Sequence, residues 1–216
     1  MKGKKYLLFD LDGTLTDSKP GIISSIKYGL TECGITPPDD ATLETFIGPP
    51  IWDSLVRVYK HSREQADKVV AKYREHYTTK GMFDNSVYEG IEDLLAQALK
   101  KEKTLIVATS KPLVFAETIL EYLGIKRYFK YVYGGDLEGK LSSKEDVVKC
   151  VLQGARIDNL SEAVMIGDTK YDMYGASFNG IGSVGVTYGY GKREELIEYG
   201  AGVIVDSVLE LAGVLL

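Results

Sequence analysis

The sequence has little cysteine and no long hydrophobic run. Its 216 residues include two cysteines, Cys33 and Cys150, which lie far apart and outside any CxxC or Cys/His ligand spacing. Neither a disulfide framework nor a zinc site is therefore expected. No apolar stretch approaches the roughly 20 residues that a helix needs to span a bilayer. The first five residues lead directly into a strand pattern rather than a signal sequence, so we expect a cytoplasmic protein without a membrane partner.

The sequence also lacks net positive charge. It has 26 Lys and Arg residues against 31 Asp and Glu residues, which gives a formal net charge of -5 at pH 7. Nucleic-acid binding depends on basic side chains that meet backbone phosphates, so this balance disfavours a nucleic-acid partner. An anionic ligand would have to be held by a metal ion and a few local donors.

Short apolar runs predict β-strands that are buried on both faces. Such runs are typical of a parallel sheet covered by helices rather than of an antiparallel sheet with one wet face. Helical patterns alternate with the runs, so we expect right-handed βαβ units and an α/β fold with a Rossmann-like parallel sheet flanked by helices. The predicted strands are Tyr6–Asp10, Thr104–Thr109, Tyr131–Gly134, Ala163–Gly167, Ser183–Thr187 and Val203–Val205, and the predicted helices are Val87 or Gly90 to Lys101, Leu113–Leu123, Lys144–Gln153, Asp172–Gly180 and Glu194–Tyr199.

The stretch from about Lys19 to Asp84 breaks this alternation. Its apolar residues recur at three- and four-residue spacing, which is typical of helices. Clusters of proline, glycine and aspartate punctuate it. We therefore expect residues 19–84 to form a small all-helical domain, inserted into an α/β core made of residues 1–18 and 85–216.

The most informative segment pairs two carboxylates at the end of the first predicted strand. Asp10 and Asp12 are two positions apart, so both project to the same side while Leu11 points back to the core. Carboxylates this close share a cation or shift their protonation. Gly13 permits a sharp departure from the strand, which leaves both acids at the carboxyl edge of the sheet, where ligands bind in open α/β folds.

A second acidic segment follows the strand Ala163–Gly167. Asp168 stands at the tip of this strand, and Asp172 lies one turn into the next helix. If the two strands are neighbours, their carboxylates converge, and hard oxygen ligands with room for water and a phosphate oxygen suit Mg²⁺. We expect Asp172 to orient its neighbours, with direct metal ligation as the alternative.

Two further segments offer donors for an anion. Thr109, Ser110 and Lys111 end a strand just before a helix, and free amides and hydroxyls at such a turn make a natural phosphate seat. Lys144 opens a later helix and would serve as a point charge on a phosphoryl group. Lys140 precedes the same helix and is the alternative; the burial pattern of the following valines favours Lys144.

These segments occur in a recognisable order. A DxDGT motif after the first strand, a Thr or Ser at the end of a second, a lysine at the start of a later helix and a GDxxxD motif cover essentially the whole chain. Together they resemble the four motifs of the haloacid dehalogenase superfamily. The helical insert after the first motif is similar to the cap of its phosphoglycolate-phosphatase-like members. The resemblance implies that Asp10 lies on the central strand and that the cap closes over it.

The resemblance also implies an activity, that of a Mg²⁺-dependent phosphatase for a small phosphorylated metabolite. Asp10 would be the nucleophile, and Asp12 would act as general acid and then as general base. Mg²⁺ would be held by the Asp10 carboxylate, the backbone carbonyl of Asp12 and the Asp168 carboxylate. Thr109 and Lys144 would donate to the phosphoryl oxygens.

The sequence leaves the substrate open, because the catalytic residues meet only the phosphoryl group. Phosphoglycolate, a 5'-nucleotide or a similar metabolite all fit. The alternatives are a phosphomutase of the β-phosphoglucomutase type, which would pass the phosphoryl group to a sugar, and a pyrophosphatase. A non-catalytic binding module is the remaining alternative; the intact Asp10, Asp12 and Asp168 argue against it. The oligomeric state is not indicated.

Overall fold

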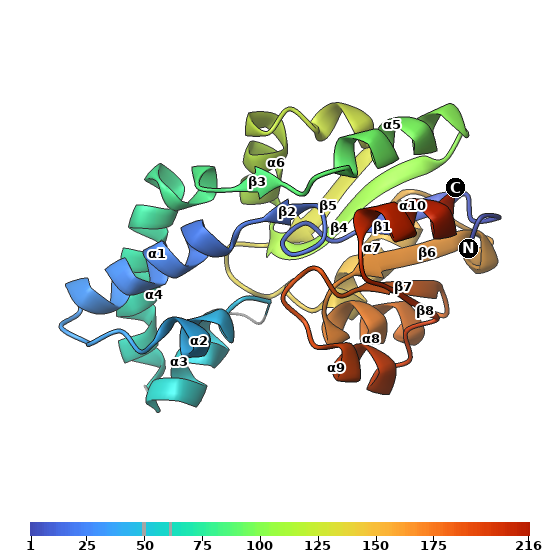
Figure 1. Ribbon diagram of the computed structural model, residues 1–216. Helices are drawn as coiled ribbons and strands as arrows, with labels where there is room; N and C mark the ends of the chain where they lie inside the picture. Colours follow the sequence, from blue (N-terminus) through green and yellow to red (C-terminus); the bar gives the residue numbers. More distant parts are fainter. Residues whose placement is uncertain (49–50, 61) are drawn as a thin grey trace. The chain divides into compact units, whose positions relative to one another are not determined.

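A parallel six-stranded sheet forms the centre of the fold (Figure 1). The computed structural model describes residues 1–48, 51–60 and 62–216. The strand order is β5-β4-β1-β6-β7-β8, and all adjacent strands run parallel. The predicted α/β fold and its strands are confirmed. Their bounds are β1 Tyr6–Phe9, β4 Thr104–Pro112, β5 Tyr131–Gly135, β6 Ala163–Gly167, β7 Gly182–Val186 and β8 Val203–Val205.

Strand β1 lies inside the sheet, between β4 and β6. Tyr6 pairs with Thr104 on one side and with Ala163 on the other. Leu7 and Leu8 of this strand are fully buried, as expected for a strand covered on both faces. Because the strands are parallel, their carboxyl ends meet at one edge of the sheet.

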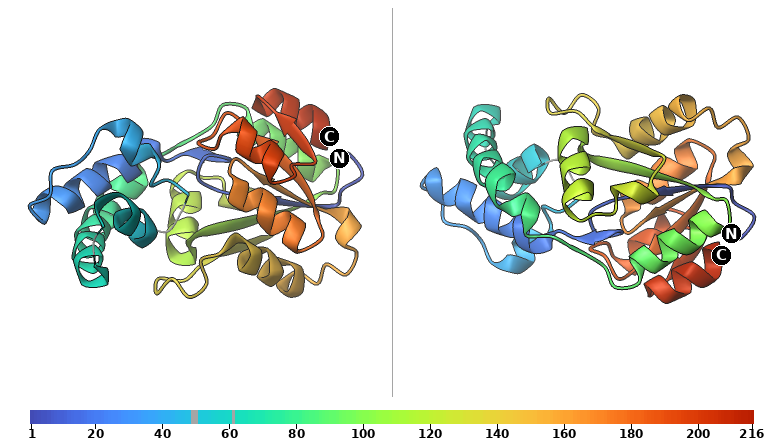
Figure 2. Two further views of the ribbon diagram at one scale, coloured as in Figure 1. Left: turned by 90° about the horizontal axis from the view of Figure 1, so that it is seen from below. Right: turned by 90° about the horizontal axis from the view of Figure 1, so that it is seen from above.

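Helices cover both faces of the sheet (Figure 2). On one face α7 (Lys144–Gly154) and α8 (Lys170–Phe178) pack against each other and against the strands, with Val147 and Val151 in a core that includes Leu8, Ile106 and Met165. On the opposite face α5 (Ile91–Lys100) packs against β4 and against α10 (Val208–Leu215). Helix α6 (Leu113–Tyr122) contacts β4 and β5, and α9 (Arg193–Glu198) contacts β8.

The helices predicted between the strands are all present, with shifted ends. Helix α8 begins at Lys170, two residues before the predicted start, because Thr169 takes the N-terminal capping position. Helix α10 was not predicted, since its nearly uniform apolar run has no clear helical period. The short strands β2 (Thr16–Asp17) and β3 (Ser86–Val87), which pair in a separate sheet, were also missed because two residues carry no pattern.

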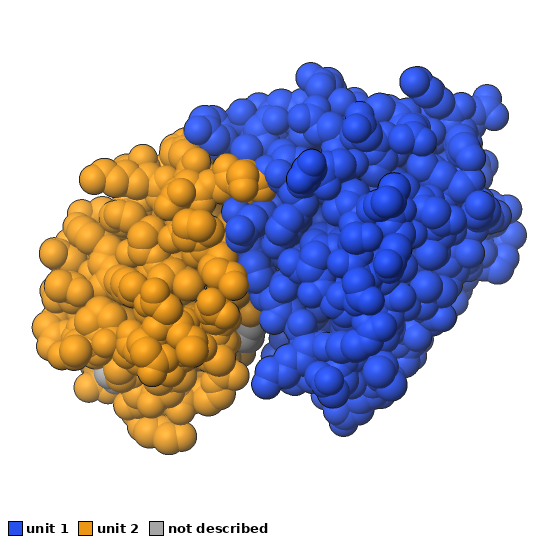
Figure 3. Space-filling view, viewed as in Figure 1, with its two compact units in different colours: residues 1–17, 87–216 blue, residues 18–86 orange. Residues whose placement is uncertain are grey.

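The chain divides into two compact units, which Figure 3 distinguishes by colour. The first consists of Met1–Asp17 and Val87–Leu216 and contains the six-stranded sheet. The second is Ser18–Ser86, and the predicted insert, residues 19–84, lies within it. Its helices are α1 Lys19–Glu32, α2 Asp40–Glu44, α3 Ile51–Tyr59, α4 Arg63–Thr79 and the short 3-10 helix Gly81–Phe83.

Helices α1 and α4 approach each other closely at Gly29. A Cβ atom on Gly29 would lie 2.8 Å from the backbone oxygen of Val69 and 2.9 Å from the backbone nitrogen of Tyr73. Backbone atoms cannot move aside as a flexible side chain does, so this crossing requires a residue without a side chain. Among the described residues, no helix combines the length and the apolar character needed to cross a membrane.

We therefore predict that Gly29→Ala destabilises the protein, although alanine is intrinsically the better helix former by about 0.5–1 kcal/mol. The forced separation of α1 and α4 should lower the free energy of unfolding by about 1–3 kcal/mol, as overpacking does. The matched control is Gly213→Ala in α10, where a Cβ atom would meet nothing within 4 Å and stability should rise. Urea unfolding followed by circular dichroism measures the free energy of unfolding of both variants. A Gly29→Ala protein as stable as the parent would contradict the close approach of α1 and α4 at Gly29.

Candidate active site

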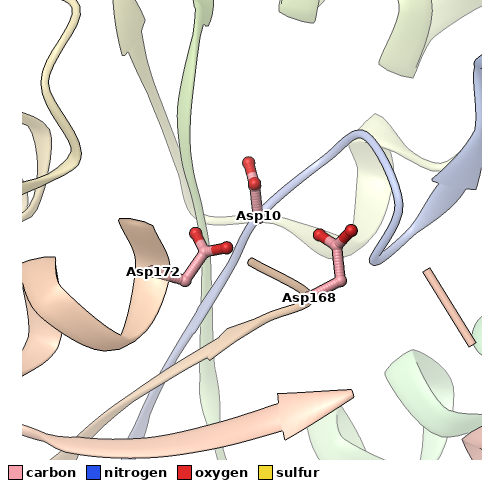
Figure 4. Close-up of side chains that lie close together, drawn as sticks. All are labelled: Asp10, Asp168 and Asp172. Carbon is pink, nitrogen blue, oxygen red and sulfur yellow. The ribbon is translucent and has the colours of Figure 1, made fainter. Parts of the chain in front are cut away.

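Three buried carboxylates converge at the carboxyl edge of the sheet. Asp10 follows β1, Asp168 follows β6 and Asp172 lies in the first turn of α8. One oxygen from each lies within 4.8 Å of the others (Figure 4). The exposed fractions are 8% for Asp10 and 0% for both others. We refer to these three residues as the acid cluster.

The register of the sheet brings the acid cluster together. Phe9 pairs with Ile166, and the backbone N–H of Asp10 donates to the Ile166 carbonyl at 2.9 Å, so the two chains leave the sheet side by side. Gly13 then turns the chain with a φ of 79°. A Cβ atom there would lie 2.2 Å from Oδ2 of Asp168, so only glycine allows this approach.

The ammonium group of Lys144 lies between two members of the acid cluster. Its Nζ is 2.8 Å from Oδ1 of Asp10 and 2.8 Å from Oδ1 of Asp172, and it donates to the Ala108 carbonyl at 3.1 Å. The side chain is almost completely buried. Burial by itself would lower the pKa of Lys144, but Asp10 and Asp172 outweigh that effect and raise the pKa above its ordinary value. Lys144 is therefore a fixed positive charge.

The structure distinguishes the two lysines that the sequence offered. Ser143 caps α7 by accepting a hydrogen bond from the backbone N–H of Asp146, and Lys144 is the first residue of the helix, where it points to the acid cluster. Lys140 is exposed, and its backbone N–H donates to Oδ1 of Asp136. In the described part of the chain, Lys144 is the lysine of this pair that reaches the acids.

The buried charges do not balance. Three carboxylates face a single ammonium, which leaves two negative charges uncompensated if all groups are ionised. Burial is the main cause that raises the pKa of Asp168 well above its usual range, and Asp172 and Asp10 add to it. Burial also raises the pKa of Asp10, although Lys144 opposes the shift. A divalent cation would supply the missing charge, and carboxylate oxygens are the ligands that Mg²⁺ prefers.

Asp12 lies beside the acid cluster but its carboxylate is not one of the three. Its Oδ2 is 2.8 Å from Nζ of Lys111, and both side chains are largely buried. Its Oδ1 is also buried and accepts no hydrogen bond from the residues that the structure describes. A buried oxygen without a partner is costly, so this atom is suited to a ligand, a water molecule or a transferred proton.

The predicted phosphate seat differs from the expected strand-to-helix turn. Thr109, Ser110 and Lys111 belong to β4, which continues to Pro112 with a shift of register against β5. The prediction ended the strand three residues early because polar residues interrupt the apolar run there, whereas the backbone pairing continues. Thr109 is buried, and its Oγ1 accepts a hydrogen bond from the backbone N–H of Lys111 at 3.3 Å.

Sequence reasoning missed a loop that closes over the acid cluster. Residues Tyr188–Gly191 follow β7, and the backbone N–H of Tyr190 donates to Oδ2 of Asp168 at 2.8 Å. Thr14 donates to the other oxygen of Asp168 at 3.1 Å. A Cβ atom on Gly189 would lie 2.4 Å from Cβ of Asp168, so the backbone itself packs on the acid. The alternation of tyrosine and glycine after an apolar strand was the sequence feature that could have indicated this loop.

Comparison with known proteins defines the class. Residues 7–186 match the family model "Haloacid dehalogenase-like hydrolase", and the chain belongs to this family. It is 41% identical to a 5'-nucleotidase of Pseudomonas aeruginosa, over 88% of this chain and 86% of that one. It is 35% identical to the tyrosine-protein kinase PtkA of Mycobacterium tuberculosis, over 97% and 73% of the two chains. A solved structure of a predicted phosphatase from Clostridium acetobutylicum matches with a TM-score of 0.92 and 46% identity, over 97% of each chain.

The raised pKa of Asp168 predicts how the metal-free stability depends on pH. The native state holds this proton more tightly than the unfolded state, whose aspartate pKa is about 3.9. In EDTA the free energy of unfolding should therefore fall as the pH rises from about 4 toward the higher native pKa of Asp168. Asp168→Asn should weaken that decline and be more stable than the parent at pH 7.

The matched control for this measurement is Asp158→Asn, which changes an exposed aspartate outside the acid cluster. It should keep the pH dependence of the parent. Urea titrations at several pH values compare the three proteins. An Asp168→Asn protein that loses stability with rising pH as steeply as the parent would show that Asp168 is not strained by burial.

Proposed function

We propose that this chain is a Mg²⁺-dependent phosphoric monoester hydrolase that transfers a phosphoryl group first to Asp10 and then to water. The observation that carries the proposal is the uncompensated charge of the acid cluster at the carboxyl end of the central strand. A buried site with an excess of two negative charges favours a dication, and a dication there offsets the repulsion between Asp10 and an anionic phosphate. Membership of the hydrolase family supports the same reading.

The carboxylates of Asp10 and Asp168 and the backbone carbonyl of Asp12 would hold the ion. When bound, Mg²⁺ supplies positive charge that neutralises the phosphoryl oxygens in the transition state. Asp172 would instead hold Lys144, since its Oδ1 contacts the ammonium group and its Oδ2 accepts from both the N–H and the hydroxyl of Thr169. We therefore propose for Asp172 the orienting role expected from the sequence.

In the first step, Asp10 attacks phosphorus. Its Oδ1 is held by the backbone N–H of Leu11 at 2.7 Å and by Lys144, which fixes the carboxylate and leaves Oδ2 to act as the nucleophile. The new bond joins Oδ2 to phosphorus, and the ester bond from phosphorus to the leaving oxygen breaks. Asp12 gives that oxygen a proton from Oδ1, the atom that accepts no hydrogen bond from the described residues, while Lys111 holds Oδ2.

In the second step, water hydrolyses the aspartyl phosphate. Asp12, now ionised, takes a proton from the water molecule, and the water oxygen bonds to phosphorus as the bond to Asp10 breaks. Inorganic phosphate leaves, and both carboxylates return to their starting states. Thr109, Ser110, Lys111 and Lys144 would donate to the phosphoryl oxygens, and one such donor is commonly worth about 10² to 10³ in rate.

We propose that the substrate is a small phosphorylated metabolite, with a 5'-nucleotide or phosphoglycolate as the first candidates. The similarity to a 5'-nucleotidase supports the nucleotide. We assign catalysis to residues 1–18 and 85–216 and substrate selection to a helical cap, residues 19–84, because the acid cluster acts only on the phosphoryl group that all these substrates share.

Transfer to an acceptor other than water is a second candidate. The similarity to a chain named as a tyrosine-protein kinase favours it. Both reactions would pass through phosphorylated Asp10, so they differ in the acceptor that enters in the second step. Incubation with an isotopically labelled phosphoester, followed by separation of inorganic phosphate from phosphorylated protein and sugar, distinguishes hydrolysis from transfer.

The direct test of the proposal is phosphate release from a generic aryl phosphate. We expect release in Mg²⁺ and none in EDTA, and Asp10→Asn should lower kcat by about 10³-fold or more, since it removes the nucleophile. Asp158→Asn should keep the parent activity. Rapid acid quenching followed by mass spectrometry should find a phosphoryl group on Asp10 in the parent protein. Metal-independent release, or full activity of Asp10→Asn, would refute the proposed mechanism.

A further inference from the structure

One residue of the loop Tyr188–Gly191 contacts both the acid cluster and the point where the chain leaves the first unit. We refer to this segment as the tyrosine loop. The backbone N–H of Tyr190 donates to Oδ2 of Asp168 at 2.8 Å, and its hydroxyl donates to Oδ1 of Asp17 at 2.9 Å. Asp17 ends β2 and is the last residue before the second unit. Tyr190 therefore connects an acid of the cluster with the outgoing linker.

The tyrosine loop also contacts the returning linker. Tyr88 follows β3, and its hydroxyl lies near the side chain of Tyr190. The ring of Tyr88 packs edge-on against the ring of Tyr188, with centroids 5.1 Å apart. The backbone N–H of Tyr88 donates to the Leu15 carbonyl at 3.1 Å, just before β2. Both linkers thus contact the tyrosine loop.

The tyrosine loop has little freedom to move independently of the acids. The Tyr188 hydroxyl donates to the Thr14 carbonyl at 3.0 Å. A Cβ atom on Gly189 would lie 2.2 Å from the Gly13 carbonyl oxygen, and one on Gly191 would lie 1.9 Å from the Asp168 carbonyl oxygen. A loop packed this tightly transmits a displacement of Asp168 rather than absorbing it.

We propose that Tyr190 is a positioning residue that couples Asp168 to both linkers, so that metal binding at the acid cluster and the hydrogen-bonded conformation of the linkers stabilise each other. This inference rests on the proposed function, because it takes Asp168 as a ligand of Mg²⁺. Tyr190 would act on the metal through Asp168, to which its backbone N–H donates. Its backbone orients the Asp168 carboxylate, and its hydroxyl fixes the loop relative to Asp17.

The coupling must act in both directions. If the linker contacts favour the orientation of Asp168 that binds Mg²⁺, bound Mg²⁺ must favour the linker contacts by the same factor. Tyr190 is the residue through which the two events communicate, since its backbone is hydrogen-bonded to an acid of the cluster and its hydroxyl is hydrogen-bonded to Asp17. Bound Mg²⁺ would then keep both linkers in their hydrogen-bonded conformation during turnover.

The test uses the full chain with the hydroxyl of Tyr190 removed. Tyr190→Phe keeps the backbone N–H that donates to Asp168 and loses the contact with Asp17. The matched control is Tyr174→Phe, which removes the hydroxyl of an exposed tyrosine in α8. Calorimetric titration gives the dissociation constant of Mg²⁺, and hydrogen exchange gives the protection of the amides of Asp17, Ser18, Val87 and Tyr88 with and without Mg²⁺.

We expect Tyr190→Phe to weaken Mg²⁺ binding about fivefold or more and to abolish the Mg²⁺-dependent protection of the linker amides. Tyr174→Phe should match the parent in both measurements. An unchanged dissociation constant, or linker protection that persists in Tyr190→Phe, would overturn the coupling while leaving the proposed function intact. A parent protein that does not bind Mg²⁺ would overturn the proposed function and the coupling with it.

A second variant separates coupling from a local packing defect. Asp17→Ala removes the acceptor of the same hydrogen bond from the opposite side. If that bond carries the effect, the variant with both changes should bind Mg²⁺ no more weakly than the single variant that has the lower Mg²⁺ affinity. Losses that multiply in the double variant would show that the two residues act independently, and the inference would be wrong.

Discussion

The burial of three carboxylates around one ammonium is the constraint on which the rest of this structure depends. Lys144 satisfies Asp10 and Asp172, and Asp168 is left with hydrogen bonds from Thr14 and Tyr190. Such an arrangement is unfavourable for folding by itself, because buried charge without a counter-charge is costly. A bound cation would relieve this cost, so the unfavourable burial of the acids would favour metal binding.

The parallel sheet makes this concentration of charge possible. Pairing of β1 with β6 delivers Asp10 and Asp168 to one edge, and α7 brings Lys144 to the same place from a distant part of the sequence. Glycine permits the final approach. At Gly13 and Gly189 a Cβ atom would meet Asp168 itself, so the turn after β1 and the tyrosine loop reach the acid as bare backbone.

Much of this arrangement was predictable from the sequence, because it depends on local patterns. Apolar runs that end in aspartate predicted the strands and the positions of Asp10 and Asp168, and the spacing of the valines that follow it favoured Lys144. What could not be predicted depends on contacts between distant segments. The extension of β4 through Lys111 follows from its pairing with β5. The ion pair of Lys111 with Asp12 depends on where the folded chain positions these two distant residues. The hydrogen bond from Tyr190 to Asp168 likewise forms only when β7 lies beside β6.

The measurement that tests the central claim most directly is a crystal structure of the protein soaked in Mn²⁺, with data collected at a wavelength where manganese scatters anomalously. Mn²⁺ replaces Mg²⁺ at oxygen sites and identifies itself by its signal. Our account predicts one strong anomalous peak between the carboxylates of Asp10 and Asp168, with Lys144 still contacting Asp10 and Asp172. The account would be contradicted by a fully occupied peak elsewhere on the chain together with none at the acid cluster.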